Sequence, residues 1–203
     1  MKLNLPNRLT LIRAVLVPFF IAFMIYPFFG EDNILWSRLI SAAIFGLAAF
    51  TDFLDGNIAR KRGLVTSFGK FMDPLADKFM IFAALIAILY SGFIFPEGGI
   101  VPTAILSNVF FWMSLIIIFR ELTVTSLRLV VSGDANIVIP ANRWGKIKTV
   151  SQIATILVVI LEPLIKVTGG VMSLASMIIT AFFTLFSGYT YVKDYWKYID
   201  PTK

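Results

Sequence analysis

Four regularly spaced aspartates are the residues of this sequence best placed to carry chemistry. They follow the pattern D-x2-D-G-x2-A-R-x8-G-x3-D-x3-D, and they are Asp52, Asp55, Asp73 and Asp77. The surrounding residues are apolar enough to lie in a membrane, where a carboxylate costs about 2.5–3.5 kcal/mol on insertion scales. Lipid-facing positions do not explain four such groups, so we expect cations to lie among them.

The type of ligand atom indicates which cations these would be. Carboxylate oxygens without nitrogen or sulfur partners suit Mg²⁺, Mn²⁺ or Ca²⁺. Four negative charges match two divalent ions, and a pair of metal ions roughly 3.5–4 Å apart promotes in-line displacement at phosphorus. The alternative is that the aspartates pair with cations at the helix ends, namely Arg60, Lys61, Lys70 and Lys78. That alternative does not explain why small residues lie on the same helix faces as the aspartates.

Two neighbouring helices are expected to bring the four carboxylates together. The residues that share one helix face are Asp52, Asp55, Gly56 and Ala59 on the first, and Gly69, Asp73 and Asp77 on the second. The connection at 60–68 is short and basic, so the two helices should be adjacent and antiparallel. At 1.5 Å per residue, all four carboxylates then lie within about 12 Å of the cytoplasmic surface. The predicted site is a shallow acidic layer open to that side.

The composition places these helices in a membrane. Of 203 residues, 58% are hydrophobic and 15% are charged, against about 45–50% and 25% in soluble domains. We therefore expect an integral membrane protein with one domain, residues 1–203. The sequence contains no cysteine and no histidine, which excludes disulfides, thiolate metal sites and imidazole bases. Acid–base chemistry is left to Asp, Glu, Lys, Tyr or water.

The apolar stretches predict an all-α fold. Each is long enough to cross a hydrocarbon core of about 30 Å, and the six stretches are 8–29, 34–60, 70–91, 101–128, 146–166 and 171–196. Most Lys and Arg residues fall on the side of this map that holds both termini. The positive-inside rule therefore makes both termini cytoplasmic. Residues 1–7 are polar and are a candidate for an amphipathic surface helix.

The aspartate pattern resembles the signature of the CDP-alcohol phosphotransferase family, with every position filled and every gap matching. The resemblance implies a six-helix membrane fold, and transfer of a phosphatidyl or similar group from a CDP-linked donor to an alcohol, with release of CMP. Residues 4–13 and 141–149 resemble the bacterial phosphatidylglycerophosphate synthases. That narrower resemblance implies CDP-diacylglycerol and glycerol 3-phosphate as substrates and a bacterial inner membrane as the location. The family resemblance implies a homodimer, and the positive-inside rule makes the site face the cytoplasm.

The family resemblance also assigns roles to individual residues. It makes Asp52, Asp55 and Asp73 ligands of divalent ions, Mg²⁺ or Mn²⁺. Asp77 would be a further ligand and the general base that assists attack by the alcohol. The residues assigned to the CDP-linked donor are Gly56, Ala59, Arg60 and Gly69.

The acceptor needs fixed cations, because glycerol 3-phosphate carries a dianionic phosphate. The candidates are Arg120, Arg128, Arg143, Lys146 and Lys148. The alternative for the last three is a basic membrane flank attracted to anionic lipid. For Arg120 it is a structural pair with Glu121 or with a motif aspartate. Asn7 and Thr10 are further candidates for binding the donor, or else the acceptor.

Two kinds of alternative function remain at this point. Within the same reaction class, the acceptor would be inositol phosphate, serine or phosphatidylglycerol. From another class, a cation or proton-coupled transporter would use intramembrane acids as a relay. Transporter sites usually lie near the membrane midplane between repeated halves. Here the acids lie toward one side, and the halves of the sequence do not resemble each other.

Overall fold

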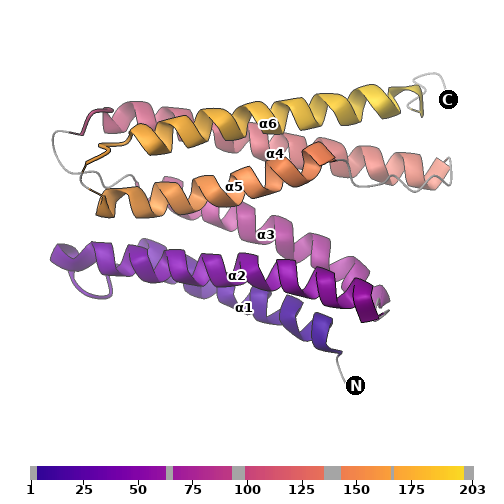
Figure 1. Ribbon diagram of the computed structural model, residues 1–203, viewed down its shortest axis with the longest axis horizontal. Helices are drawn as coiled ribbons and strands as arrows, with labels where there is room; N and C mark the ends of the chain where they lie inside the picture. The colour runs from indigo at the N-terminus through magenta and orange to yellow at the C-terminus, as the bar shows by residue number, and fades with distance from the viewer. Residues whose placement is uncertain (1–3, 63–65, 93–98, 135–142, 166, 199–203) are drawn as a thin grey trace.

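The structure is a computed structural model that describes residues 4–62, 66–92, 99–134, 143–165 and 167–198. Side chains are described at these positions except 53–62, 70, 132–134 and 197. The described residues form helices and connecting turns, without strands. The long helices, shown in Figure 1, are α1 (Leu5–Ile25), α2 (Ile34–Arg62), α3 (Ser67–Ser91), α4 (Thr103–Asp134), α5 (Arg143–Leu161) and α6 (Val171–Tyr195). Short 3-10 turns are η1 (Glu31–Asn33), η2 (Glu162–Leu164) and η3 (Trp196–Tyr198).

The predicted all-α membrane fold is confirmed in its main features. Within the described residues, five helical segments are long and apolar enough to cross a membrane, and they correspond to every long helix except α3. The protein is therefore an integral membrane protein, and the count of six spans stays a prediction. The first turn of α1 and the last turn of α6 lie at the same end of the molecule, on the right of Figure 1. We call this end the site end.

Helix caps fix where the site-bearing helices begin. Asn4 caps α1, and its side chain accepts a hydrogen bond from the Asn7 backbone N–H at 3.1 Å. Thr66 caps α3, and its hydroxyl accepts from the Gly69 N–H at 3.0 Å. Side-chain caps satisfy N–H groups that have no partner within the helix. The cap at Thr66 places Asp73 within the second turn of α3.

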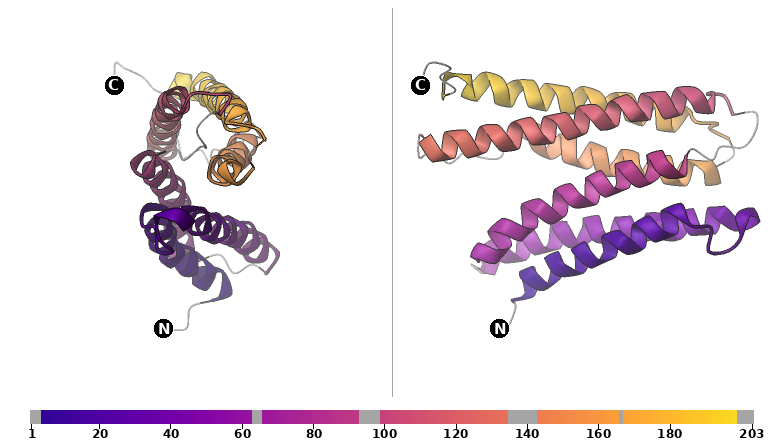
Figure 2. Two further views of the ribbon diagram at one scale, coloured as in Figure 1. Left: turned by 90° about the vertical axis from the view of Figure 1, so that its left-hand side faces the viewer. Right: turned by 180° about the vertical axis from the view of Figure 1, so that it is seen from behind.

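The helices form two groups that α3 joins. In one group, α1 packs against both α2 and α3, while in the other α6 packs against both α4 and α5. Contacts of α3 with α4 and α5, and of α2 with α5, connect the groups. Figure 2 shows the two groups from the end and from behind. Residues on α3 are therefore in a position to act on both.

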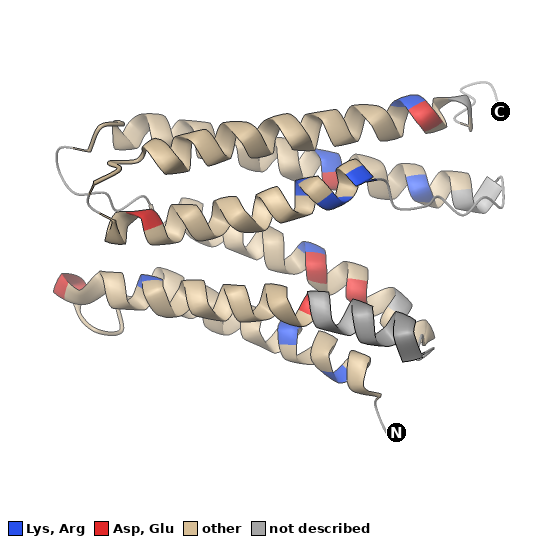
Figure 3. Cartoon of the chain, in the orientation of Figure 1, with Lys and Arg blue, Asp and Glu red and all other residues tan. Residues whose placement is uncertain are grey.

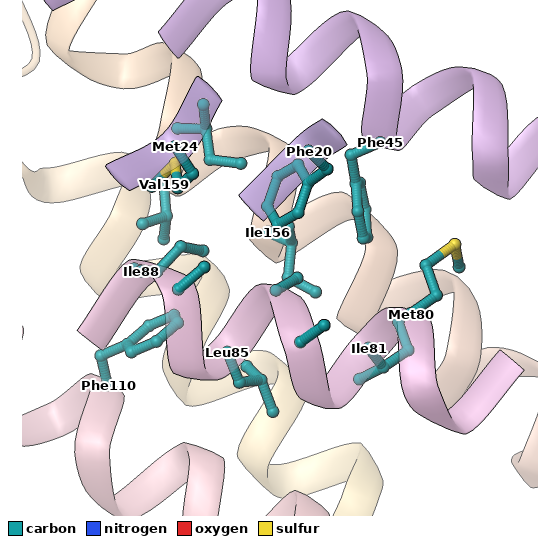
Figure 4. Packing of buried hydrophobic residues seen from close by; sticks show 14 of the residues in the cluster. Phe20, Met24, Phe45, Met80, Ile81, Leu85, Ile88, Phe110, Ile156 and Val159 are labelled. Carbon is teal, nitrogen blue, oxygen red and sulfur yellow. The ribbon is translucent and has the colours of Figure 1, made fainter. Parts of the chain in front are cut away.

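Large apolar side chains hold α3 between the groups. Leu85 and Ile88 of α3 are fully buried, and they lie among side chains of α1, α2, α4 and α5 (Figure 4). The rings of Phe20 on α1 and Phe45 on α2 pack with centroids 5.6 Å apart. Close packing of this kind resists sliding of one helix past another. This packing therefore fixes the position and rotation of α3 relative to the helices of both groups.

Candidate active site

One buried arginine on α1 joins the aspartates of two other helices. Arg13 has a side chain with 0% exposure, and its Nη1 lies 3.1 Å from Asp52 Oδ1 on α2. The same nitrogen pairs with Asp77 Oδ1 on α3. Figure 3 shows the corresponding basic segment of α1 beside acidic segments of α2 and α3. The Asp52 and Asp77 side chains remain 34% and 43% exposed, so both carboxylates are accessible to a ligand.

Asp73, the third motif aspartate with a described side chain, is oriented by a buried threonine. Thr10 Oγ1 donates to Asp73 Oδ1 at 2.6 Å, and the Thr10 residue is 0% exposed. Thr10 lies one helical turn before Arg13, so a single face of α1 contacts Asp52, Asp73 and Asp77. The structure thus places the Thr10 hydroxyl against a motif aspartate. Its sequence-predicted contact with a substrate stays a prediction.

A polar contact at the start of α3 explains the glycine of the motif. Thr66 Oγ1 donates to Asn7 Oδ1 at 3.1 Å, and Asn7 is buried. A Cβ at Gly69 would lie 3.1 Å from Asn7 Oδ1 and 3.6 Å from Asp73 Oδ2. The space beside Gly69 is therefore needed by the Asn7 side chain, next to a predicted metal ligand.

The donor atoms of this cluster fit a hard divalent cation. All of them are carboxylate oxygens, and the Arg13 guanidinium already lies between two of the acids as a positive charge. Among the residues that the structure describes, no group of three or more acidic side chains lies close enough to hold a metal ion. The predicted ligand Asp55 lies outside the described side chains, as do the predicted donor-site residues Gly56, Ala59 and Arg60.

A second charged cluster lies across α3, with the opposite balance of charge. Glu121 Oε1 on α4 accepts from Arg120 Nη1 at 3.1 Å and also pairs with Lys148 Nζ of α5. Arg120 Nη2 donates to Ser187 Oγ of α6 at 2.7 Å. Arg120, Glu121 and Lys148 are all buried. The structural pair of Arg120 with Glu121, one of the two alternatives expected from the sequence, is therefore present.

A residue of α3 connects the two clusters. Lys78 interacts electrostatically with both Glu121 and Lys148, and it follows Asp77 directly in the chain. Consecutive residues on a helix point about 100° apart. Asp77 thus pairs with Arg13 of the acidic cluster, while Lys78 lies within electrostatic range of Glu121 and Lys148.

Tyr191 on α6 holds two of the predicted acceptor-site arginines. Its ring centroid is 5.4 Å from Arg120 Cζ and 5.1 Å from Arg128 Cζ, within the range of a cation–π contact. Arg128 Nη2 also donates to Tyr191 Oη at 2.7 Å. Arg143 and Lys146, in the first turn of α5, are exposed, so they lie at the rim of the basic cluster.

From the sequence, Arg13, Ser187 and Tyr191 were not assigned to the site, and Glu121 was expected only as a structural partner of Arg120. A signal existed for Arg13, because it is a charged residue inside an apolar stretch and such residues usually have a buried partner. Tyr191 stands near the end of an apolar stretch, where interfacial aromatic residues are common, but it is only 2% exposed and packs under the arginines. Pattern alone does not separate these two situations, since both place tyrosine near a helix end.

Comparison with known proteins supplies an independent line of evidence. Residues 3–186 match the CDP-alcohol phosphatidyltransferase family. A CDP-diacylglycerol–glycerol-3-phosphate 3-phosphatidyltransferase of Bacillus subtilis is 38% identical over 201 residues, covering 96% of each chain. One of the same name from Rickettsia felis is 35% identical and covers 96% of this chain and 97% of its own. A probable phosphatidylglycerophosphate synthase of Mycobacterium tuberculosis H37Rv is 36% identical over 192 residues, covering 93% of this chain and 80% of its own.

Proposed function

Because the chain belongs to the CDP-alcohol phosphatidyltransferase family, we propose that it transfers the phosphatidyl group of CDP-diacylglycerol to glycerol 3-phosphate. The products are phosphatidylglycerol phosphate and CMP. One observation of the structure carries the proposal. Two adjacent α3 residues face clusters of opposite charge, with Asp77 paired to Arg13 and Lys78 interacting with Glu121. The reaction needs an acidic and a basic site side by side. It brings together a donor whose diphosphate requires divalent cations and an alcohol that carries a phosphate.

The acidic cluster would hold the divalent ions. The family is generally metal-dependent, and the proposed ligands are Asp52, Asp55, Asp73 and Asp77, with Mg²⁺ or Mn²⁺ as the ion. When bound, such ions supply positive charge that offsets the donor's diphosphate and the departing CMP. Arg13 and Thr10 keep the carboxylates of Asp52, Asp73 and Asp77 in place.

Asp77 is the proposed general base. An alcohol is a weak nucleophile at neutral pH, and a carboxylate that takes its proton during attack promotes the reaction. The alcohol oxygen forms a bond to the phosphorus that carries diacylglycerol, the bond from that phosphorus to CMP breaks, and the proton passes to Asp77. Arg13 pairs with Oδ1 of Asp77 and so orients the carboxylate that would take the proton.

The basic cluster would bind the phosphate of the acceptor. It holds three cations, Arg120, Lys148 and Lys78, against the single acid Glu121, which leaves a surplus of two positive charges. A phosphate dianion complements that surplus, and arginine binds phosphate in a bidentate manner. Arg128, Arg143 and Lys146 lie farther out and would attract the anionic acceptor to the site.

The proposal includes a setting for the reaction. All 203 residues would form one domain with six spans, both termini and the site end would face the cytoplasm, and the membrane would be a bacterial inner membrane. The basic residues at the site end support this orientation through the positive-inside rule. We further propose that the protein acts as a homodimer surrounded by membrane lipid.

An acceptor panel tests the function. The protein purified in detergent is supplied with CDP-diacylglycerol and Mg²⁺ or Mn²⁺, and CMP release is measured with each of four alcohols. The acceptors are glycerol 3-phosphate, inositol phosphate, serine and phosphatidylglycerol. We expect release with glycerol 3-phosphate and formation of phosphatidylglycerol phosphate. Activity confined to another acceptor would contradict the proposal.

A further inference from the structure

Glu121 lies at the centre of the basic cluster. Its Oε1 accepts from Arg120 of its own helix at 3.1 Å and pairs with Lys148 of α5. Lys78 of α3 interacts with it electrostatically. One buried carboxylate therefore contacts or faces cations from three helices, α3, α4 and α5.

Without this carboxylate, the three cations would repel one another. Like charges a few ångströms apart destabilise each other strongly where water is largely excluded. Arg120 has further partners, because Ser187 accepts from its Nη2 and the Tyr191 ring lies under its guanidinium. Lys148 has Glu121 as its hydrogen-bond partner among the described residues. Loss of Glu121 should thus displace Lys148 more than Arg120.

We propose that Glu121 is a positioning residue for the acceptor, which holds Lys148 and Arg120 where they bind the acceptor's phosphate. The inference rests on the proposed function and deepens it, because it assigns a role to an acid inside an anion-binding site. Glu121 acts through the two cations and does not itself touch the phosphate. The negative charge of Glu121 also lowers the net positive charge of the basic cluster, so that one phosphate dianion can balance it.

The surrounding packing shows that this arrangement is specific. A Cβ at Gly188 of α6 would lie 3.1 Å from Arg120 Cγ, so the glycine makes room for the arginine stem. Tyr191, three residues later on the same face of α6, is buried and lies against the Arg120 guanidinium. The Arg120 side chain thus packs against α6, and Glu121 holds its Nη1 and Lys148 together.

Two substitutions separate positioning by charge from simple packing. Glu121→Gln keeps the shape of the side chain and removes its charge, whereas Glu121→Asp keeps the charge and removes one methylene. If the role is to hold cations, the aspartate variant should retain more acceptor binding than the glutamine variant. If the role is only packing, the order should be reversed, since glutamine fills the same volume.

Glu162 provides a matched control. It is also a buried glutamate, but its carboxylate accepts from the backbone N–H groups of Gly170, Met172 and Ser173 near the start of α6. That region lies at the opposite end of the molecule from the site end. Glu162→Gln should lower the midpoint of thermal unfolding and leave the acceptor KM unchanged.

The experiment combines kinetics with binding. For the wild type, Glu121→Gln, Glu121→Asp and Glu162→Gln, we would measure KM for both substrates, and the Kd of glycerol 3-phosphate and of inorganic phosphate by calorimetry. We expect Glu121→Gln to raise the acceptor KM and both Kd values at least about tenfold. The donor KM should stay within about twofold, and Glu121→Asp should lie between the wild type and Glu121→Gln.

The outcomes distinguish the inference from the function on which it rests. Unchanged phosphate affinity in Glu121→Gln, or better binding by Glu121→Gln than by Glu121→Asp, overturns the inference even if the wild type makes phosphatidylglycerol phosphate. Weakened phosphate binding with the expected order of variants supports the inference even if the preferred alcohol proves to be another phosphorylated one. If Glu121→Gln does not fold, the Kd of glycerol 3-phosphate is compared between Glu121→Asp and Glu162→Gln. A higher Kd in Glu121→Asp supports the inference, and equal values overturn it.

Discussion

The two helix groups hold charge in opposite ways. In the α1–α3 group, the buried cation Arg13 contacts two of the three motif aspartates whose side chains are described, while Thr10 holds the third. In the α4–α6 group, one buried acid, Glu121, pairs with two cations and faces Lys78 from α3. Among the described side chains, the acids of the first cluster outnumber its cation, and the cations of the second outnumber its acid. Figure 3 shows both clusters toward the site end.

The comparison indicates how each cluster is kept stable before a ligand arrives. A close group of like charges is unfavourable, most of all where it is buried, and a single internal counter-ion reduces the repulsion without cancelling it. The remaining charge has the sign that would attract a divalent cation on one side and a phosphate on the other. Arg13 and Glu121 are therefore buried counter-ions of opposite charge with the same role, one in each cluster.

The largest effect is expected from Asp77→Asn. The amide cannot accept the proton of the alcohol, so turnover should fall by roughly 10²–10⁴-fold. Binding of CDP-diacylglycerol, measured by calorimetry, should largely survive because Asp52 and Asp73 remain. Near-normal CMP release by this variant would refute the assignment of Asp77 as the base.

Removal of the internal cation of the acidic group comes next. Arg13→Met leaves Asp52 and Asp77 without their shared partner, and breaking a buried ion pair costs about 3–5 kcal/mol. We expect a lower midpoint of thermal unfolding and little turnover. Because the cluster is then more negative, Mg²⁺ should raise the midpoint of Arg13→Met more than that of the wild type. An equal shift in both proteins would show that Arg13 does not share its site with a divalent ion.

The corresponding change in the basic group should affect one substrate selectively. Arg120→Ala removes a cation near the proposed phosphate site, and we expect the acceptor KM to rise at least about tenfold while the donor KM changes little. Steady-state kinetics with each substrate varied in turn provides the measurement. A parallel rise in both constants would indicate that Arg120 serves only to pack α4 against α6.

The smallest effect is expected at the glycine beside the acidic group. Gly69→Ala would place a methyl group 3.1 Å from Asn7 Oδ1, so Asn7 or the start of α3 must shift by a few tenths of an ångström. We expect turnover to fall about two- to tenfold, since small misplacements of ligands reduce activity. Gly46→Ala is the matched control, because a Cβ at Gly46 meets nothing within 4 Å. Equal activity of Gly69→Ala and Gly46→Ala would show that the close approach of Asn7 to Gly69 does not matter for activity.

Much of the fold follows from local sequence patterns. The apolar stretch at 171–196 corresponds to α6 at Val171–Tyr195, and each other stretch contains or overlaps one helix. The differences lie at the ends. The third stretch was predicted to begin at residue 70, but α3 begins at Ser67 because Thr66 caps it. A hydroxyl cap extends a helix into polar residues that hydropathy alone excludes.

The same distinction applies to the site, where some features follow from local spacing and others depend on contacts between distant residues. The shared face of Asp73 and Asp77 was predictable, because residues four apart lie on one side of a helix. The residues that contact the site residues from other helices were not predictable. Arg13 and Asp77 are 64 residues apart in the chain, and Arg128 and Tyr191 are 63 apart. Such contacts depend on how helices pack, which periodicity does not encode.

The most direct test of the account is the position of a metal ion in the acidic cluster. The protein crystallised with Mn²⁺ and CDP-diacylglycerol would give an anomalous difference map at the manganese absorption edge. We predict a peak in contact with carboxylate oxygens of Asp52, Asp73 and Asp77. Saturating Mn²⁺ with no peak there, or with a peak only elsewhere on the protein, would contradict the central claim.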